Sequence, residues 1–319
     1  METKYLKNWE NELNICIRCG YCYEHCHLFK LSGWEVDSPR GKLLLLYGLT
    51  TGEIEPSSYI AEKIFQCFYC GRCEGSCSAN VAVRDIFTDA KAELLEAGFD
   101  PEGTVVSIDE DFCSKCGLCV SVCKSEAITI KEDGEDKKIA VDKVKCKGCG
   151  LCIATCPSEA ITQKEGFEVS QKELLAKATN FIEAEKNGNP KIVVFCCNWS
   201  TYPELQLSQL PVQKKDISMI IVTMCVGRIG PDLILELFSC GAWGVIVAGC
   251  PPEECQHNGN YKARRRILLL KNLLGQFNIA QQRLELESIG PGESAKLTQV
   301  MNNFSKRIKK LGPIYKKEV

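Results

Sequence analysis

Several features that would identify a familiar enzyme class are missing from this sequence. The stretch at 289–294, Ile-Gly-Pro-Gly-Glu-Ser, lacks the G-x-G-x-x-G spacing of a dinucleotide-binding loop, and the chain has no P-loop. Lysine and arginine number 39 against 41 acidic residues, so no charge excess predicts binding to nucleic acid or a membrane. No apolar run approaches the roughly 20 residues of a membrane helix. The charged N-terminal stretch has no apolar signal core, so we expect a cytoplasmic protein.

Cysteine, in contrast, is abundant. The chain has 22 cysteines among 319 residues. Disulfide-rich proteins are usually small and secreted, whereas regular cysteine clusters in a long chain indicate reduced thiolate ligands. The length predicts two or three domains, each large enough to bury a core.

The central stretch carries the clearest pattern, Cys-x2-Cys-x2-Cys-x3-Cys, which occurs twice with a period of 33 residues and therefore indicates a duplicated unit. This is the run of two-cluster bacterial ferredoxins, in which the fourth cysteine of each run serves the other cluster. We therefore predict two [4Fe–4S] clusters, one held by Cys113, Cys116, Cys119 and Cys156, the other by Cys146, Cys149, Cys152 and Cys123. Zinc sites favour paired Cys-x2-Cys knuckles with wider gaps, which makes zinc a poorer interpretation.

The same run occurs twice more near the N-terminus, in a different setting. Ser38 and Pro39 predict the start of a helix, and an amphipathic helix is expected over 85–97, ending at Gly98. This half is therefore predicted to be helical. By the same crossed rule, we assign one [4Fe–4S] cluster to Cys16, Cys19, Cys22 and Cys77, and another to Cys67, Cys70, Cys73 and Cys26.

Three motifs in this half, CIRCGYCYEHC, SPRGKLLLL and CFYCGRCEGSC, resemble the helical two-cluster ferredoxin module of the heterodisulfide reductase C subunit. The resemblance covers about the first 95 residues. His27 and Ser78 stand where such modules often have a proline after the fourth cysteine. Because proline there shapes the loop and is not a ligand, the clusters are expected to persist.

After residue 165 the pattern changes. A helical linker is expected over 166–189, followed by strands at 191–195, 217–223, 244–248 and 284–288 that alternate with helices at 231–238, 262–277 and 294–310. Alternating strands and helices predict a mostly parallel sheet covered on both faces. The expected fold is multidomain, α+β and α/β, with a helical dicluster domain over 1–100, a ferredoxin-like dicluster domain over 101–165 and an α/β domain over 190–319.

Six cysteines lie in this last domain, most of them just after predicted strands. Because functional groups gather at the carboxyl ends of parallel strands, four of these thiolates are expected to hold one [2Fe–2S] cluster. We favour Cys197, Cys225, Cys250 and Cys255, with Cys196 as the alternative to its neighbour. Cys240, at a helix end, is expected to be a small buried apolar residue.

The segments FCCNW, MCVGRI and AGCPPEECQHNGNYKARRR resemble the delta subunit of the methyl-viologen-reducing hydrogenase of methanogens, over about 190–312. The resemblance implies a [2Fe–2S] cluster and docking to a flavoprotein of the heterodisulfide reductase A type. The basic run at 261–266 is either a solvated face or part of such a docking surface. Ser200 stands where relatives often carry a further cysteine.

Four [4Fe–4S] clusters and one [2Fe–2S] cluster predict that the chain transfers electrons within a complex whose catalytic site lies on another chain. The resemblances imply a heterodisulfide-reductase-type, electron-bifurcating complex of an anaerobe. The partners would be an A-type flavoprotein and a hydrogenase, formate dehydrogenase or methylenetetrahydrofolate reductase. The alternatives are a catalytic disulfide reductase, for which the single Cys196–Cys197 pair is a weak basis, and a free multi-cluster carrier.

Overall fold

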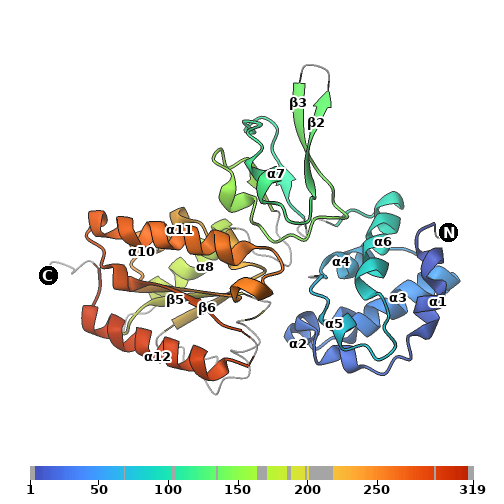
Figure 1. The fold of residues 1–319 in the computed structure, drawn as a ribbon, viewed down its shortest axis with the longest axis horizontal. Coiled ribbons are helices and arrows are strands. Elements are labelled where there is room, and N and C mark those ends of the chain that lie inside the picture. The colour runs from blue at the N-terminus through green and yellow to red at the C-terminus, as the bar shows by residue number, and fades with distance from the viewer. Residues whose placement is uncertain are drawn as a thin grey trace.

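The protein consists of a helical unit, a small ferredoxin-like unit and a sheet-containing unit (Figure 1). The computed structural model describes residues 4–67, 69–101, 105–133, 136–163, 171–184, 188–197, 200, 218–290 and 292–314. The helical unit and the sheet unit lie side by side, and the ferredoxin-like unit lies above the space between them (Figure 1). Within the described residues, no helix is both long and apolar enough to span a membrane.

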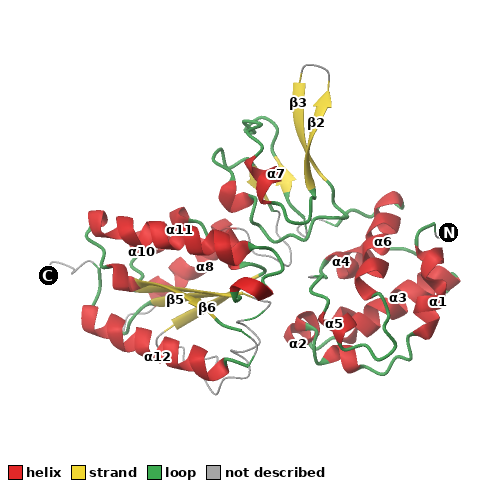
Figure 2. Cartoon of the chain, in the orientation of Figure 1, coloured by secondary structure: helices red, strands yellow, loops and turns green. Residues whose placement is uncertain are grey.

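The N-terminal unit is helical, as the sequence predicts (Figure 2). Ser38 caps the central helix of this unit, since its hydroxyl accepts the Gly41 N–H at 3.0 Å and Pro39 occupies the first turn. Gly52 ends that helix in the left-handed conformation. The helix predicted over 85–97 is present and begins slightly earlier, at Val83. The helices are α1 (Glu10–Ile15), α2 (His27–Ser32), α3 (Pro39–Thr51), α4 (Ser58–Phe65), α5 (Arg72–Gly75) and α6 (Val83–Glu96).

The ferredoxin-like unit shows its sequence duplication in its hydrogen bonds. The first repeat contributes β1 (Ser107–Ile108), α7 (Leu118–Val122) and β2 (Ile128–Asp133), and the second β3 (Asp136–Val141) and β4 (Ile161–Thr162). Each half pairs with the other, because β1 is antiparallel to β4 and β2 to β3. The Asp109 N–H donates to the Ala160 carbonyl at 2.8 Å, and the equivalent Asp142 N–H donates to Ala127 at 2.7 Å.

The C-terminal unit is a four-stranded parallel sheet with the order β6-β5-β7-β8. The strands lie where the sequence predicts them, although residue 217 is outside the described residues. They are β5 (Ile192–Cys197), β6 (Ser218–Thr223), β7 (Gly244–Gly249) and β8 (Leu284–Ser288). The helices are α8 (Gln171–Ala184), α10 (Pro231–Ser239), α11 (Gly259–Leu274) and α12 (Ser294–Leu311). The start of α11 precedes the predicted one because Asn258 adopts φ 56° and turns the chain directly into the helix.

Helices cover both faces of this sheet (Figure 1). One core contains Leu174 and Ala178 of α8, together with residues of α10 and α11, and the other contains Phe304 and Ile308 of α12. Side chains alternate along β5, so Val193, Phe195 and Cys197 lie in the first core. Ile192, Val194 and Cys196 lie in the second. The two adjacent cysteines therefore lie on opposite faces of the sheet.

Candidate iron–sulfur sites

The first N-terminal site brings together the thiols that the crossed assignment predicts. One cavity beside α3 is lined by Cys16, Cys19, Cys22 and Cys77, and also by Cys73, which lines the second cavity of this unit as well. The thiol of Cys77 belongs to the second cysteine run, so the fold brings a thiol of the second run beside those of the first. Cys19 is exposed, whereas the other three thiols of the predicted set are partly buried.

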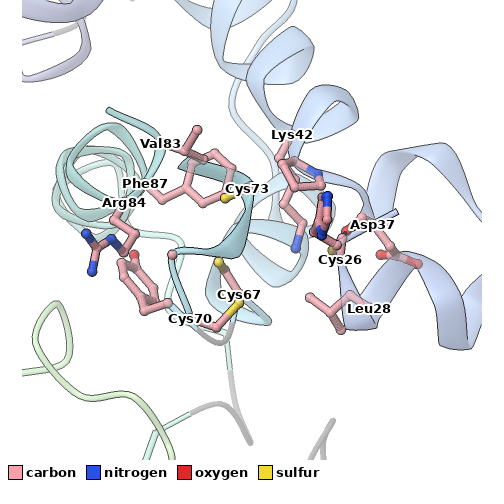
Figure 3. A pocket seen from close by; sticks show the side chains of 14 residues that line it. Cys26, Leu28, Asp37, Lys42, Cys67, Cys70, Cys73, Val83, Arg84 and Phe87 are labelled. Carbon is pink, nitrogen blue, oxygen red and sulfur yellow. Dashed lines mark hydrogen bonds between the residues drawn. The ribbon is translucent and has the colours of Figure 1, made fainter. Parts of the chain in front are cut away.

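The second N-terminal site is more enclosed. Cys26, Cys67, Cys70 and Cys73 line one cavity together with Lys42, Asp37 and Phe87 (Figure 3). Burial raises the pKa of Cys70 to about 11 and also raises the pKa of Cys73. Free thiols here would therefore be protonated at neutral pH, and metal binding would have to displace those protons.

Two buried lysines interact electrostatically with Cys67 of this site, and neither was predicted from the sequence. Lys42 and Lys91 are each 1% exposed. Burial lowers the pKa of Lys42, while Cys67, Cys26 and Asp37 act in the opposite direction. Burial lowers the pKa of Lys91 to about 8, although its ammonium lies over the rings of Tyr69 and Phe65, at 4.4 and 4.8 Å. The sequence signal for Lys42 was a charge directly before the apolar run Leu43 to Leu46 of α3.

In the ferredoxin-like unit, the cysteines form part of the core. Cys119, Cys146 and Cys152 are buried there, and Cys113, Cys123 and Cys156 pack against them. Cys149 and Cys152 both interact electrostatically with Cys123, so the structure brings this thiol of the first run to the second run. Cys116 is exposed, and the N–H of Leu118 lowers its pKa.

In the C-terminal unit, four buried thiols meet at the carboxyl ends of the strands. The sulfurs of Cys197 and Cys250 are 3.4 Å apart, and Cys255 hydrogen-bonds with both Cys225 and Cys250. The bonds of Cys255 lower its own pKa and raise the pKa of Cys225, while the pKa of Cys250 is raised first by its hydrogen bond with Cys197 and then by that with Cys255. Because like charges this close repel, four thiolates here require a metal cation.

The structure also distinguishes the remaining cysteines of this unit. Cys196 is fully buried but points into the opposite core, away from the four thiols. The prediction that Cys240 is buried is wrong. It follows the last turn of α10 and is exposed, because the apolar face of that helix is formed by residues such as Leu237 and Phe238.

The donor sets fit iron–sulfur clusters. Each predicted set contains four thiols, which is the ligand set of both [2Fe–2S] and [4Fe–4S] clusters. Within the described residues, no three His, Cys, Asp or Glu side chains converge as they would on a single metal ion. A cluster spreads its ligands over several irons, which matches the thiols that surround the two cavities of the helical unit.

The three units meet close to these sites. Leu28 of the helical unit and Met224 of the sheet unit form a buried apolar contact, against which Cys26, Cys70 and Cys149 pack. Thiols of the helical and ferredoxin-like units thus lie around a residue adjacent to Cys225.

A second contact joins the ferredoxin-like unit to the sheet unit. Arg266 donates to the Thr155 hydroxyl at 2.6 Å and to the Gly227 carbonyl at 2.7 Å. The basic run at 261–266 is therefore not uniformly a solvated face, because its last arginine joins two units of the chain.

Comparison with known proteins matches each unit separately. Residues 192–312 match the family model of the methyl-viologen-reducing hydrogenase delta subunit. Residues 12–81 and 112–169 each match a 4Fe-4S dicluster domain.

Relatives extend these matches. The vhc iron-sulfur D subunit of the F420-non-reducing hydrogenase of Methanococcus voltae is 40% identical over 135 residues, which are 42% of this chain and 94% of that protein. The A subunit of the ferredoxin/F420H2-dependent CoB-CoM heterodisulfide reductase of Methanosarcina acetivorans is 40% identical over 222 residues. That match covers 69% of this chain but spans only 26% of the reductase polypeptide.

Proposed function

Because the chain belongs to the family of methyl-viologen-reducing hydrogenase delta subunits, we propose that it relays electrons between a flavoprotein and a partner oxidoreductase. The flavoprotein would be of the heterodisulfide reductase A type. The partner would be a hydrogenase, a formate dehydrogenase or a methylenetetrahydrofolate reductase, in a complex that performs electron bifurcation in the cytoplasm. The proposed complement is four [4Fe–4S] clusters and one [2Fe–2S] cluster.

The observation that carries this proposal is the contact around Leu28 and Met224. When bound, the clusters would supply one-electron transfer, while the protein sets their positions and surroundings. At this contact, Cys26 and Cys70 come from one unit and Cys149 from another. Leu28 is 3% and Met224 7% exposed, so these side chains exclude water where the proposed ligands approach one another.

The proposed ligand sets are those that the crossed cysteine rule and the strand ends predict. In the helical unit they are Cys16, Cys19, Cys22 and Cys77, and Cys67, Cys70, Cys73 and Cys26. In the ferredoxin-like unit they are Cys113, Cys116, Cys119 and Cys156, and Cys146, Cys149, Cys152 and Cys123. In the sheet unit they are Cys197, Cys225, Cys250 and Cys255.

A catalytic disulfide reductase is the second candidate function, and its only support in the sequence is one pair of adjacent cysteines. The structure disfavours a joint role for that pair. Such an activity would use the adjacent pair Cys196 and Cys197. These side chains lie in different cores on opposite faces of β5, so they do not face a common site.

Anaerobic affinity purification from the native host tests the relay proposal. We expect a flavoprotein and a dehydrogenase or reductase to co-purify, with about 18 irons in the chain itself. Recovery of the chain alone, with the same iron content and no flavin, would show a free carrier. An electron paramagnetic resonance (EPR) signal that appears on oxidation with a thiol substrate would instead favour the catalytic alternative.

A further inference from the structure

Lys42 is an unusual residue at the second N-terminal site. It lies in the first half of α3, is 1% exposed, and is among the largest fully buried side chains. Its side chain borders the cavity lined by Cys26, Cys67, Cys70 and Cys73 (Figure 3). Within the described part of the chain, its amine has no hydrogen-bond partner.

A buried ammonium without a hydrogen bond is costly unless an anion compensates it. The neighbouring carboxylate of Asp37 compensates the charge of Lys42 only in part, because it already forms an ion pair of 2.9 Å with Lys63. The other neighbours that favour the charged form of Lys42 are Cys67 and Cys26. Neutral thiols would compensate little, whereas thiolates on an iron–sulfur cluster carry a net negative charge.

Lys91, the second buried lysine that interacts electrostatically with Cys67, provides a useful contrast. Its ammonium lies 4.4 Å from the ring centre of Tyr69 and 4.8 Å from that of Phe65. Ring faces attract a cation, so part of its charge is compensated by the fold itself. Lys42 has no such ring contact among the described residues, which leaves the cavity as the place where its charge is compensated.

We propose that the positive charge of Lys42 raises the reduction potential of the cluster held by Cys26, Cys67, Cys70 and Cys73. This inference rests on the proposed function, because it requires a redox-active cluster at that site. Reduction adds one negative charge to the cluster, and a nearby buried cation stabilises the reduced form more than the oxidised form. Because this cluster would lie beside the Leu28–Met224 contact, electrons would collect where the three units meet.

The test is a redox titration of the full chain followed by EPR, comparing wild type with Lys42→Met. Methionine removes the charge and keeps a long unbranched side chain. We expect one [4Fe–4S] step to move to lower potential, by at least a tenfold change in its one-electron equilibrium constant, which is about 59 mV. Lys30→Met is the matched control, because Lys30 is an exposed lysine on the neighbouring helix α2 and its charge is screened by water.

Lys42→Met could lose the cluster altogether, which iron analysis would show as about four fewer irons per chain. In that case Lys42→Arg, which keeps the positive charge, provides the test. Full iron content with an unmoved step in Lys42→Arg supports the proposal, since the charge is kept. A step displaced downward in Lys42→Arg overturns it, as does a titration of Lys42→Met that matches Lys30→Met. A wild-type chain without reducible clusters would instead overturn the proposed function, so the two failures are distinguishable.

Discussion

Gly259→Ala is the substitution that most directly tests the four-thiol arrangement of the sheet unit. Gly259 is the first residue of α11 and lies against the thiol of Cys225. A methyl group at this position would be 2.1 Å from the Cys225 sulfur and 3.0 Å from Cδ1 of Leu151. Ordinary van der Waals contacts to such a carbon begin near 3.4 Å. The sulfur would therefore have to move by more than an ångström.

Two opposing free-energy contributions determine how much Gly259→Ala changes the stability of the protein. Alanine in a helix is favoured over glycine by about 1 kcal/mol, so helix propensity alone predicts stabilisation. Forcing an extra methyl group into a packed site costs typically about 1–3 kcal/mol. The contact here is severe and involves the Gly227 backbone as well, at 3.3 Å. We expect the steric cost to exceed the propensity gain.

The assay combines EPR and iron analysis with thermal unfolding. We expect Gly259→Ala to lose the signal of the proposed [2Fe–2S] cluster, because the displaced Cys225 sulfur could not complete the proposed ligand set. The unfolding temperature should also fall by several degrees, at about 2–4 °C per kcal/mol. Gly275→Ala at the other end of α11 is the control, because no heavy atom lies within 4 Å of its added methyl group. A Gly259→Ala protein with the wild-type signal and unfolding temperature would refute the reasoning.

Three further predictions follow from individual sites. Cys197→Ser should remove the [2Fe–2S] signal while Cys196→Ser keeps it, because only Cys197 faces the other three thiols; loss in the second variant alone would reverse the assignment. Ser38→Ala should lower the free energy of unfolding by about 1 kcal/mol through loss of the cap on α3, measured by denaturant titration, and an unchanged midpoint would contradict the cap. Exposure to air should bleach the visible absorbance, beginning at the clusters proposed to be held by the exposed Cys19 and Cys116; a spectrum stable in air would show that these sites are protected.

Much of the fold could be predicted because the signals are local. The helix-forming and strand-forming segments after residue 230, for example, follow directly from their apolar periodicity. Ser38 and Pro39 predicted the start of α3 by the same kind of local chemistry. The cysteine spacing likewise identified the thiols available for clusters, because three ligands of each proposed [4Fe–4S] set lie in one short loop.

The sequence by itself determined which residues can act as ligands, and the tertiary structure decided which of them meet. Alternation along β5 predicts that Cys196 and Cys197 face opposite ways, but the segments after β6 and β7, with α11 packed against them, decide which face gathers Cys225, Cys250 and Cys255.

The same distinction explains the residues that were misjudged or missed. Cys240 is exposed because of how α10 packs, and Lys42 is buried because α3 lies at the centre of its unit. The meeting of Leu28, Met224 and Cys149 joins residues from three parts of the chain. No local pattern encodes such contacts, because they depend on how whole units pack against one another.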